Sequence, residues 1–447
     1  MTAIAGTTPA AAGKSPPKLG RWMTTSLVVG NMIGSGVFLL PTSLAPLGWN
    51  SVAGWILTLT GGMFLAATFV RLVRALPRAG GPYAYTRAAF GPLAAFLVAW
   101  SYWASNVIGL AAIAVAGVSY LSVLAPGLAA LPGMQIGTTC LLIWLLTLLN
   151  ISGTRDAGTF QLVTTGLKLL PLIAVIVIAA IALATDRAAI PPLHAGAFRG
   201  RDITAAATLT LWALLGLEAA TVPADKIEDP ERTIAFATIV GTAATGIVYL
   251  VTCSIVVLLM PAEALAQSGA PFADFVRRFW GPGPASLVAL FAAISCIGAL
   301  NGWILVQAEL TRAMAHDGSF PRALAAQTSR GTPARALIVS AALMTAVVLL
   351  NYTRGLIEIF KFLLLLSTAT SLFMYLVCAL AMLRMDGQRR FLLPGRRTGM
   401  VVAALAAIYS LWTIYGAGAS AVGWGLALVV LGVPIFLAGK RGTRPAR

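Results

Sequence analysis

Charged residues and histidines are scarce in this chain: only 10% of its 447 residues are Asp, Glu, Lys or Arg, and it has two histidines. Because 59% of the residues are hydrophobic, the composition excludes a soluble protein of this size. His194 and His316 both fall in predicted loops, and Ser35, in the first apolar stretch, has no visible base partner. We therefore expect that the protein is not an enzyme.

Cysteines are equally few. Cys140, Cys253, Cys296 and Cys378 lie in apolar stretches without the spacing of metal ligands. We interpret them as small packing residues, and we expect neither a metal ion nor a cofactor. The N-terminal segment lacks the apolar core of a signal peptide, so residues 1–22 are predicted to form a disordered cytoplasmic tail.

Long apolar stretches dominate the rest of the chain. Twelve of them are long enough to cross about 30 Å of hydrocarbon, which predicts an all-α polytopic membrane protein with 12 transmembrane helices. They cover residues 23–44, 51–73, 93–124, 134–151, 161–185, 203–224, 234–260, 283–311, 334–351, 356–383, 398–415 and 419–439. We interpret Trp22, Trp49 and Trp55 as anchors at the bilayer interface.

Basic residues outnumber acidic ones, and the net charge is +17. With the N-terminus in the cytoplasm, 23 of the 31 Lys and Arg lie in cytoplasmic segments and six lie outside, while Lys168 and Lys361 fall within apolar stretches. This asymmetry predicts that both termini are cytoplasmic and that residues 440–447 form a basic cytoplasmic tail. The basic excess indicates attraction to anionic membrane lipid, and no nucleic acid partner is expected.

Two of the apolar stretches are interrupted near their centres. The first contains GNMIGSGVF at 30–38, and the sixth contains LTLWALLGLEAATVPAD at 209–225. Interrupted helices at corresponding positions of two halves indicate a transporter with inverted repeats and a binding site at the midplane. We therefore expect a LeuT-like 5+5 inverted repeat with broken helices 1 and 6. Its parts are the first repeat at 23–185, the second repeat at 203–383 and two further helices at 398–439.

The first interruption has a physical use. A broken helix leaves N–H groups free at the start of its second half and C=O groups free at the end of its first half. The amides of Ser35 and Gly36 suit a carboxylate, and the carbonyl of Met32 suits an ammonium group. An amino acid carries both groups and could bind to the two halves of the helix at once. The alternative is helix packing, because Gly30 and Gly34 form a GxxxG pattern.

Six segments of the chain resemble, in order, those of a known family. They are GNMIGSGVFLLP (30–41), PRAGGPYAYTRAAFGP (77–92), LWALLGLEAATV (211–222), EDPERTIAFA (228–237), GALNGWILVQ (298–307) and AHDGSFP (315–321). The chain resembles the amino acid–polyamine–organocation superfamily, and most closely the basic amino acid/polyamine antiporters such as the arginine/agmatine antiporter. The resemblance implies a multi-pass protein of a bacterial-type inner membrane with a small amino acid or amine as substrate. The resemblance leaves open whether the protein forms a homodimer.

The resemblance also implies roles for single residues. The residues expected to bind substrate are Met32, Ser35, Gly36, Trp212, Leu215 and Trp303. The indoles among them would face the substrate side chain, where they can hold aliphatic carbons or a cation. The positions that resemble gating residues are Tyr102, Trp212 and Glu218. Glu218 is also a candidate proton sensor, because a carboxyl group inside a membrane span is costly and usually functional.

Two residues depart from the arginine/agmatine antiporter. Leu110 stands where that antiporter has an asparagine that contacts the guanidinium, and Asn106, one helical turn earlier, would substitute for it in part. Lys168 stands where that antiporter is apolar. Proton-coupled symporters and some neutral amino acid exchangers of the superfamily resemble this sequence in having a lysine at this position. The resemblance implies that its ammonium lies near carbonyls freed at Gly34 and stands in for a sodium ion. The alternative is a lysine that snorkels.

Two functions within this family follow from these residues. The first is a secondary amino acid transporter, an antiporter of the basic amino acid/polyamine type that works by alternating access. The second is a proton-coupled symporter or an exporter of neutral amino acids that uses Lys168. No P-loop occurs, so transport must draw on gradients. No continuous polar stripe or charge ring runs along the apolar stretches, which argues against a channel or a receptor-like sensor.

Overall fold

The computed structural model describes residues 19–77, 80–131, 133–152, 167–194, 196–222, 224, 227–329, 331–351, 353–387 and 395–442. Over these residues the chain is helical, and the one β-bridge joins Leu19 to Ile227. The predicted tails lie outside the described residues except for their inner ends. Residues 161–166 of the fifth predicted stretch also lie outside them.

Apolar helices cover all twelve predicted stretches, as far as these are described. Ten segments are long and apolar enough to cross a membrane, and α9 and α15 are shorter apolar helices. The helices are α1 (Arg21–Met32), α2 (Ser35–Leu44), α3 (Trp49–Ala75), α5 (Pro92–Leu124), α7 (Met134–Ser152), α9 (Leu170–Ala184), α10 (Gly200–Leu211), α11 (Pro230–Leu259), α14 (Pro282–His316), α15 (Ala334–Leu349), α16 (Leu356–Gly387), α17 (Arg396–Gly416) and α18 (Gly418–Gly442). The prediction of an all-helical membrane protein is confirmed.

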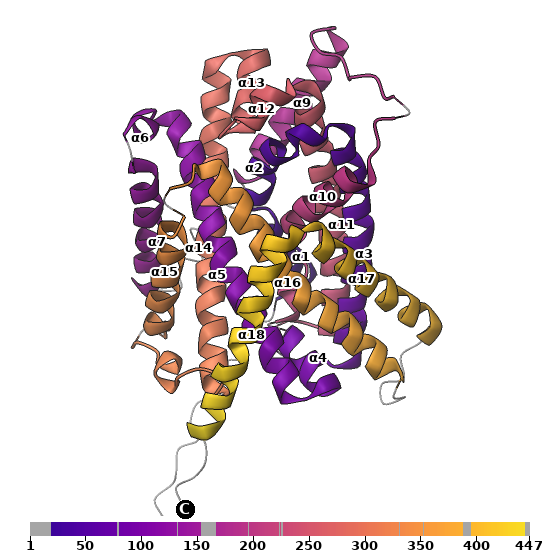
Figure 1. The fold of residues 1–447 in the computed structure, drawn as a ribbon, viewed down its shortest axis with the longest axis vertical. Helices are drawn as coiled ribbons and strands as arrows, with labels where there is room; N and C mark the ends of the chain where they lie inside the picture. Colours follow the sequence, from indigo (N-terminus) through magenta and orange to yellow (C-terminus); the bar gives the residue numbers. More distant parts are fainter. Residues whose placement is uncertain are drawn as a thin grey trace, which may run out of the picture.

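Short helices connect the long ones at the two ends of the molecule. The short helix α4 (Gly81–Phe90) lies at the end of the molecule where α18 ends, and α12 (Ala262–Ala266) and α13 (Pro271–Trp280) lie at the opposite end (Figure 1). The α4 end is therefore the end that the charge asymmetry assigns to the cytoplasm.

The core forms where the broken helices are surrounded by long unbroken ones. α5 packs along α14 and α16 on one side, and α3 packs against α10 and α11 on the other. In the most apolar window of α5, 78% of the residues are buried, against 22% in α18. The sequence of α18 is similarly apolar to that of α5. Its exposed apolar side chains are therefore suited to contact with lipid.

Both predicted interruptions are present. α1 ends at Met32, Ile33 and Gly34 are not helical, and α2 begins at Ser35. α10 ends at Leu211 and continues as one short 3-10 turn before the backbone becomes extended. Gly216 then has a φ of +106°, a conformation that residues with a Cβ rarely adopt, so glycine is required there.

One prediction about the tryptophans is wrong. Trp22 is 72% exposed, as expected of an interface anchor, but Trp55 is fully buried. Its ring lies 5.9 Å from that of Tyr249 on α11. Trp55 lies on the side of α3 that faces α11. Its side chain is therefore packed between helices and cannot reach the bilayer interface.

Candidate functional site

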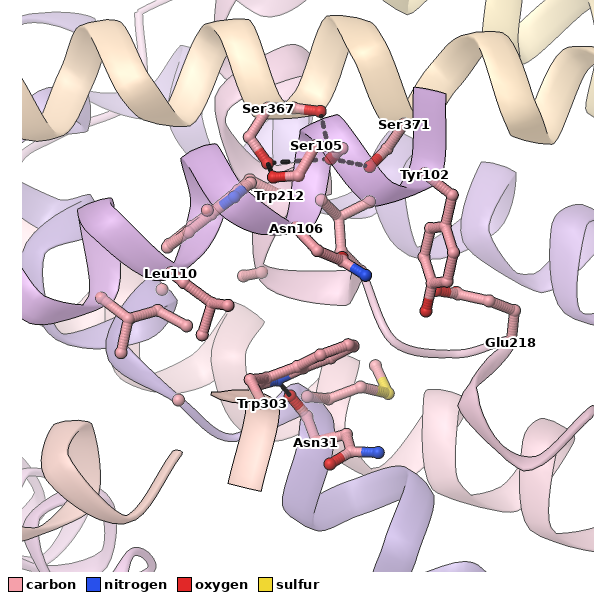
Figure 2. Close-up of a pocket in the computed structure, with 17 residues that line it drawn as sticks. Asn31, Tyr102, Ser105, Asn106, Leu110, Trp212, Glu218, Trp303, Ser367 and Ser371 are labelled. Carbon is pink, nitrogen blue, oxygen red and sulfur yellow. Dashed lines mark hydrogen bonds between the residues drawn. The ribbon is translucent and has the colours of Figure 1, made fainter. Parts of the chain in front are cut away.

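The two interruptions meet at one cavity, which α5, α14 and α16 complete (Figure 2). Nine predicted site residues line it: Met32, Gly36, Tyr102, Asn106, Leu110, Trp212, Leu215, Glu218 and Trp303. Of the other two, Lys168 does not line the cavity, and the side chain of Ser35 lies outside the described part of the chain. Lining residues that the sequence did not single out for this site are Asn31, Gly34, Ser105, Gly109, Ile113, Ala213, Ser367 and Ser371.

Lys168 lies behind the cavity, against the end of α1. Its side chain is fully buried, and Nζ donates a hydrogen bond of 2.9 Å to the carbonyl oxygen of Gly30. The carbonyls in the last turn of a helix lack an intrahelical partner, and this one obtains a cationic donor. This contact agrees with the expectation that the ammonium lies near carbonyls freed at Gly34, because in an unbroken helix the Gly30 carbonyl would accept from the Gly34 amide. The burial also argues against a snorkelling side chain.

The two following carbonyls of α1 are bonded in the same way. The indole N–H of Trp303 donates to the carbonyl of Asn31 at 3.1 Å. The hydroxyl of Tyr249 donates to the carbonyl of Met32 at 2.9 Å, and so does the amide of Gly34. The Met32 carbonyl therefore already accepts two hydrogen bonds, and a substrate ammonium would have to displace one of them.

The start of α2 lies directly against the second interruption. The amides of Ser35 and Gly36 belong to its first turn, where N–H groups have no intrahelical acceptor. A Cβ added at Gly36 would lie 3.1 Å from Cζ3 of Trp212 and 3.2 Å from Cα of Ala213. Glycine at this position lets the two interruptions approach each other, and it leaves the amide end of α2 open toward the cavity.

The second interruption carries a buried carboxyl group. Glu218 is 1% exposed, and its Oε2 accepts hydrogen bonds from the hydroxyl of Tyr375 at 2.5 Å and from the amide of Gly216 at 3.2 Å. The ring of Tyr102 extends to the same carboxyl group (Figure 2). An acidic side chain inside apolar surroundings is stable only with such donors or with a cation beside it.

Aromatic rings form two walls of the cavity. Trp212 packs edge-on against Phe360 with a centroid separation of 5.5 Å. Trp303 lies on the opposite wall, next to Asn31 (Figure 2), and a Cβ at Gly216 would meet its ring at 3.3 Å. Both indoles are less than a tenth exposed, so a bound molecule would contact them away from bulk water.

Three serine hydroxyls form the wall of the cavity between α5 and α16. Ser105 Oγ lies 2.5 Å from Ser371 Oγ and 3.0 Å from Ser367 Oγ, and it donates to the Ser367 carbonyl at 2.9 Å. Ser367 and Ser371 are four residues apart in the polar run STATS (367–371) of α16, so both lie on the face of the helix that contacts α5. This spacing is a signal that could have identified them from the sequence.

The residues expected at the guanidinium position are also present. Leu110 lines the cavity beside Trp212 (Figure 2). Asn106 lies one turn earlier, and its Nδ2 completes no hydrogen bond with the part of the chain that the structure describes. A ligand acceptor could therefore bind to Asn106 without displacing a protein group. Within the same described part, no cluster of three or more His, Cys, Asp or Glu could hold a metal ion.

Known proteins resemble the chain over almost its whole length. The amino acid permease family model matches residues 19–436, which include every residue of the cavity. The cadaverine/lysine antiporter of Escherichia coli strain K12 is 35% identical over 342 residues, which are 75% of each chain. The putrescine transporter PotE of the same strain is 28% identical over 424 residues, covering 94% of this chain and 95% of the relative. PotE of Haemophilus influenzae is 28% identical over 427 residues, covering 94% and 96%.

Proposed function

Since the chain belongs to the amino acid permease family, we propose that it is a secondary antiporter that exchanges a basic amino acid for a polyamine. It would span the inner membrane of a bacterium twelve times, with both termini in the cytoplasm. Residues 23–185 and 203–383 would form the two inverted repeats, and 398–439 the two further helices. The paired interruptions in α1–α2 and after α10 support this arrangement.

The observation that carries the proposal is a cavity between two helix interruptions that has an acidic group at the second one. Glu218 is the one acidic side chain among the lining residues. A positively charged amine beside it would gain a charge-assisted interaction in surroundings with little water. Trp212 and Trp303 would hold the aliphatic chain between the charged groups, or a cation by cation–π attraction.

An amino acid and a polyamine would share this amine site and differ at α2. The carboxylate of the amino acid would bind the amides of Ser35 and Gly36 at the positive end of that helix. A diamine lacks the carboxylate and would use only the acidic and aromatic part of the cavity. One site could then accept both compounds in turn, which is what alternating exchange requires.

The second candidate function is proton-coupled transport of neutral amino acids. The observation that favours it is Lys168, whose buried ammonium is bonded to the carbonyl of Gly30. If that ammonium lost its proton during the cycle, transport would depend on a proton gradient. In the antiporter, Lys168 would instead keep its charge and hold the end of α1.

Counterflow in liposomes separates the two functions. The purified protein is reconstituted with lysine, ornithine, arginine, cadaverine, putrescine, agmatine, leucine or alanine inside, and uptake of the labelled compounds is measured. The antiporter requires a basic amino acid or a polyamine on the opposite side. Uptake of leucine or alanine into empty liposomes, driven by an imposed proton gradient, would replace it with the second candidate.

A further inference from the structure

Three threonines of α11 carry hydroxyl groups without a hydrogen-bond partner. Thr238, Thr242 and Thr245 are at most 2% exposed, and none of their Oγ1 atoms bonds to any residue that the structure describes. Thr252 on the same helix behaves differently, because its Oγ1 donates to the Val248 carbonyl at 2.8 Å. Threonine in a helix usually makes this local bond, so the other three hydroxyls point away from their own backbone.

The three threonines share one face of α11. At 100° per residue, positions 238, 242, 245 and 249 lie within about 60° of one another. A Cβ at Gly241, on one side of this face, would lie 3.0 Å from Val28 of α1. A Cβ at Gly246, on the other side, would collide with Leu59 of α3. The hydroxyls therefore point into the seam where α1, α3 and α11 meet.

The seam follows α11 from Thr238 toward the first interruption. At its far end the hydroxyl of Tyr249 donates to the carbonyl of Met32 at the first interruption. From Thr238 to Tyr249 the helix rises roughly 16 Å, about half of the hydrocarbon thickness.

A fourth polar group faces the same seam from α3. The ring of Trp55 packs against that of Tyr249, and its Nε1 is buried and unbonded within the described residues. The indole can only donate, while each threonine hydroxyl can both donate and accept. Together they offer donors and acceptors along one line in an otherwise apolar contact.

We infer that the seam between α1, α3 and α11 binds a file of ordered water molecules that runs from Thr238 to the back of the first interruption. Buried polar groups in native proteins are nearly always satisfied, and where no protein partner exists the partner is usually water. None of the seam residues Thr238, Thr242, Thr245 and Trp55 lines the substrate cavity. The file does not depend on which substrate the cavity takes.

Labelling of an introduced thiol tests the seam directly. Thr242→Cys is compared with Thr252→Cys in proteoliposomes treated with 2-aminoethyl methanethiosulfonate, and the modified peptides are identified by mass spectrometry. Only a thiolate reacts, and it forms only where water is present. Thr242 lies nearer the midpoint of α11 than Thr252, so simple depth would protect it more. Native Cys253, which is fully buried, is the internal control.

We expect the Thr242→Cys thiol to react at least tenfold faster than that of Thr252→Cys and faster than Cys253. Equal slow labelling of all three thiols overturns the inference. If Thr242→Cys does not insert, Thr238→Cys on the same face takes its place.

Replacement by valine gives a second measurement that needs no reagent. In a dry seam, Thr242→Val removes an unpartnered hydroxyl without changing the shape, and the melting temperature rises. In a hydrated seam it removes a partner of the water file, and the melting temperature falls, as it does for Thr252→Val, which loses its bond to Val248. A melting temperature of Thr242→Val at or above that of the wild type overturns the inference.

Discussion

The two helix interruptions are stabilised in opposite ways. At the first, the last carbonyls of α1 accept hydrogen bonds from Lys168, Trp303 and Tyr249, which come from three other parts of the chain. At the second, the carboxyl group of Glu218 accepts hydrogen bonds from Tyr375 and from a backbone amide. The protein thus supplies donors at one interruption and an acceptor at the other.

This difference gives the cavity a polarity, with one end that attracts anions and one end that attracts cations. Because the carbonyls of α1 are occupied by protein donors, the first interruption offers a ligand mainly the amides at the start of α2, which attract an anion. The second interruption offers a carboxyl group, which attracts a cation. A zwitterionic amino acid fits both, and an amine fits only the second. Each of the following substitutions changes one side of this comparison.

The largest expected effect is that of Gly36→Val. The added Cβ alone would lie 3.1–3.2 Å from Trp212 and Ala213, and the two methyl groups beyond it would fill the space between the interruptions. We expect uptake of every substrate to fall at least 100-fold while the protein still inserts, which is checked by liposome uptake and by size-exclusion profile. Gly137→Val is the control, because a Cβ at that glycine meets nothing within 4 Å. Normal substrate affinity in Gly36→Val would show that the amide end of α2 is not part of the site.

Glu218→Gln is expected to have the next largest effect. The amide oxygen of glutamine can still accept from Tyr375 and Gly216, so the fold is retained, but the negative charge is lost. A buried charge-assisted hydrogen bond contributes about 1.5–3 kcal/mol, which corresponds to a loss of affinity of about 10- to 150-fold. The loss should be similar for lysine and for cadaverine, because both would place an amine there. Direct binding measured by calorimetry checks it, and unchanged cadaverine affinity would contradict the polarity.

The positions of the interruptions could be predicted from the sequence, because three glycines cluster in GNMIGSGVF and the sixth stretch combines Gly216 with the acidic Glu218. The partners at the interruptions could not. Lys168 is the exception, because it was expected near carbonyls freed at Gly34 and it bonds the carbonyl of Gly30, whose partner in an unbroken helix would be the Gly34 amide. Trp55 and Ser105 were misjudged or missed because α3 and α5 are apolar on most faces, so no periodicity indicates which side faces the protein interior.

Lys168→Met distinguishes a lysine that only stabilises the end of α1 from a cation that is needed for transport. Leaving the Gly30 carbonyl unbonded costs about 1–3 kcal/mol, whereas removing a buried charge relieves a desolvation cost of several kcal/mol. The second effect is larger, so we expect an equal or higher melting temperature together with at least a tenfold loss of transport. Lys361→Met is the matched control, because that lysine is exposed on α16. A lower melting temperature with proportionate loss of transport would make Lys168 a purely structural residue.

The smallest expected effect distinguishes the two indoles. Trp303 donates to the carbonyl of Asn31 and so braces the first interruption, whereas Trp212 belongs to the second and packs against Phe360. In Trp303→Phe an aromatic ring remains at the cavity, but one neutral hydrogen bond of about 1 kcal/mol is lost. We therefore expect a drop in melting temperature of a few degrees with less than a threefold change in substrate affinity.

Trp212→Phe should give the reverse result in the same two assays. Its smaller ring loses contact with the substrate, but no carbonyl of α1 loses a donor, so affinity falls more and stability falls less. Identical changes in both variants would mean that the hydrogen bond to Asn31 does not hold the first interruption. The carbonyl end of α1 would then be free to bind the substrate amine, and the polarity of the cavity would be reversed.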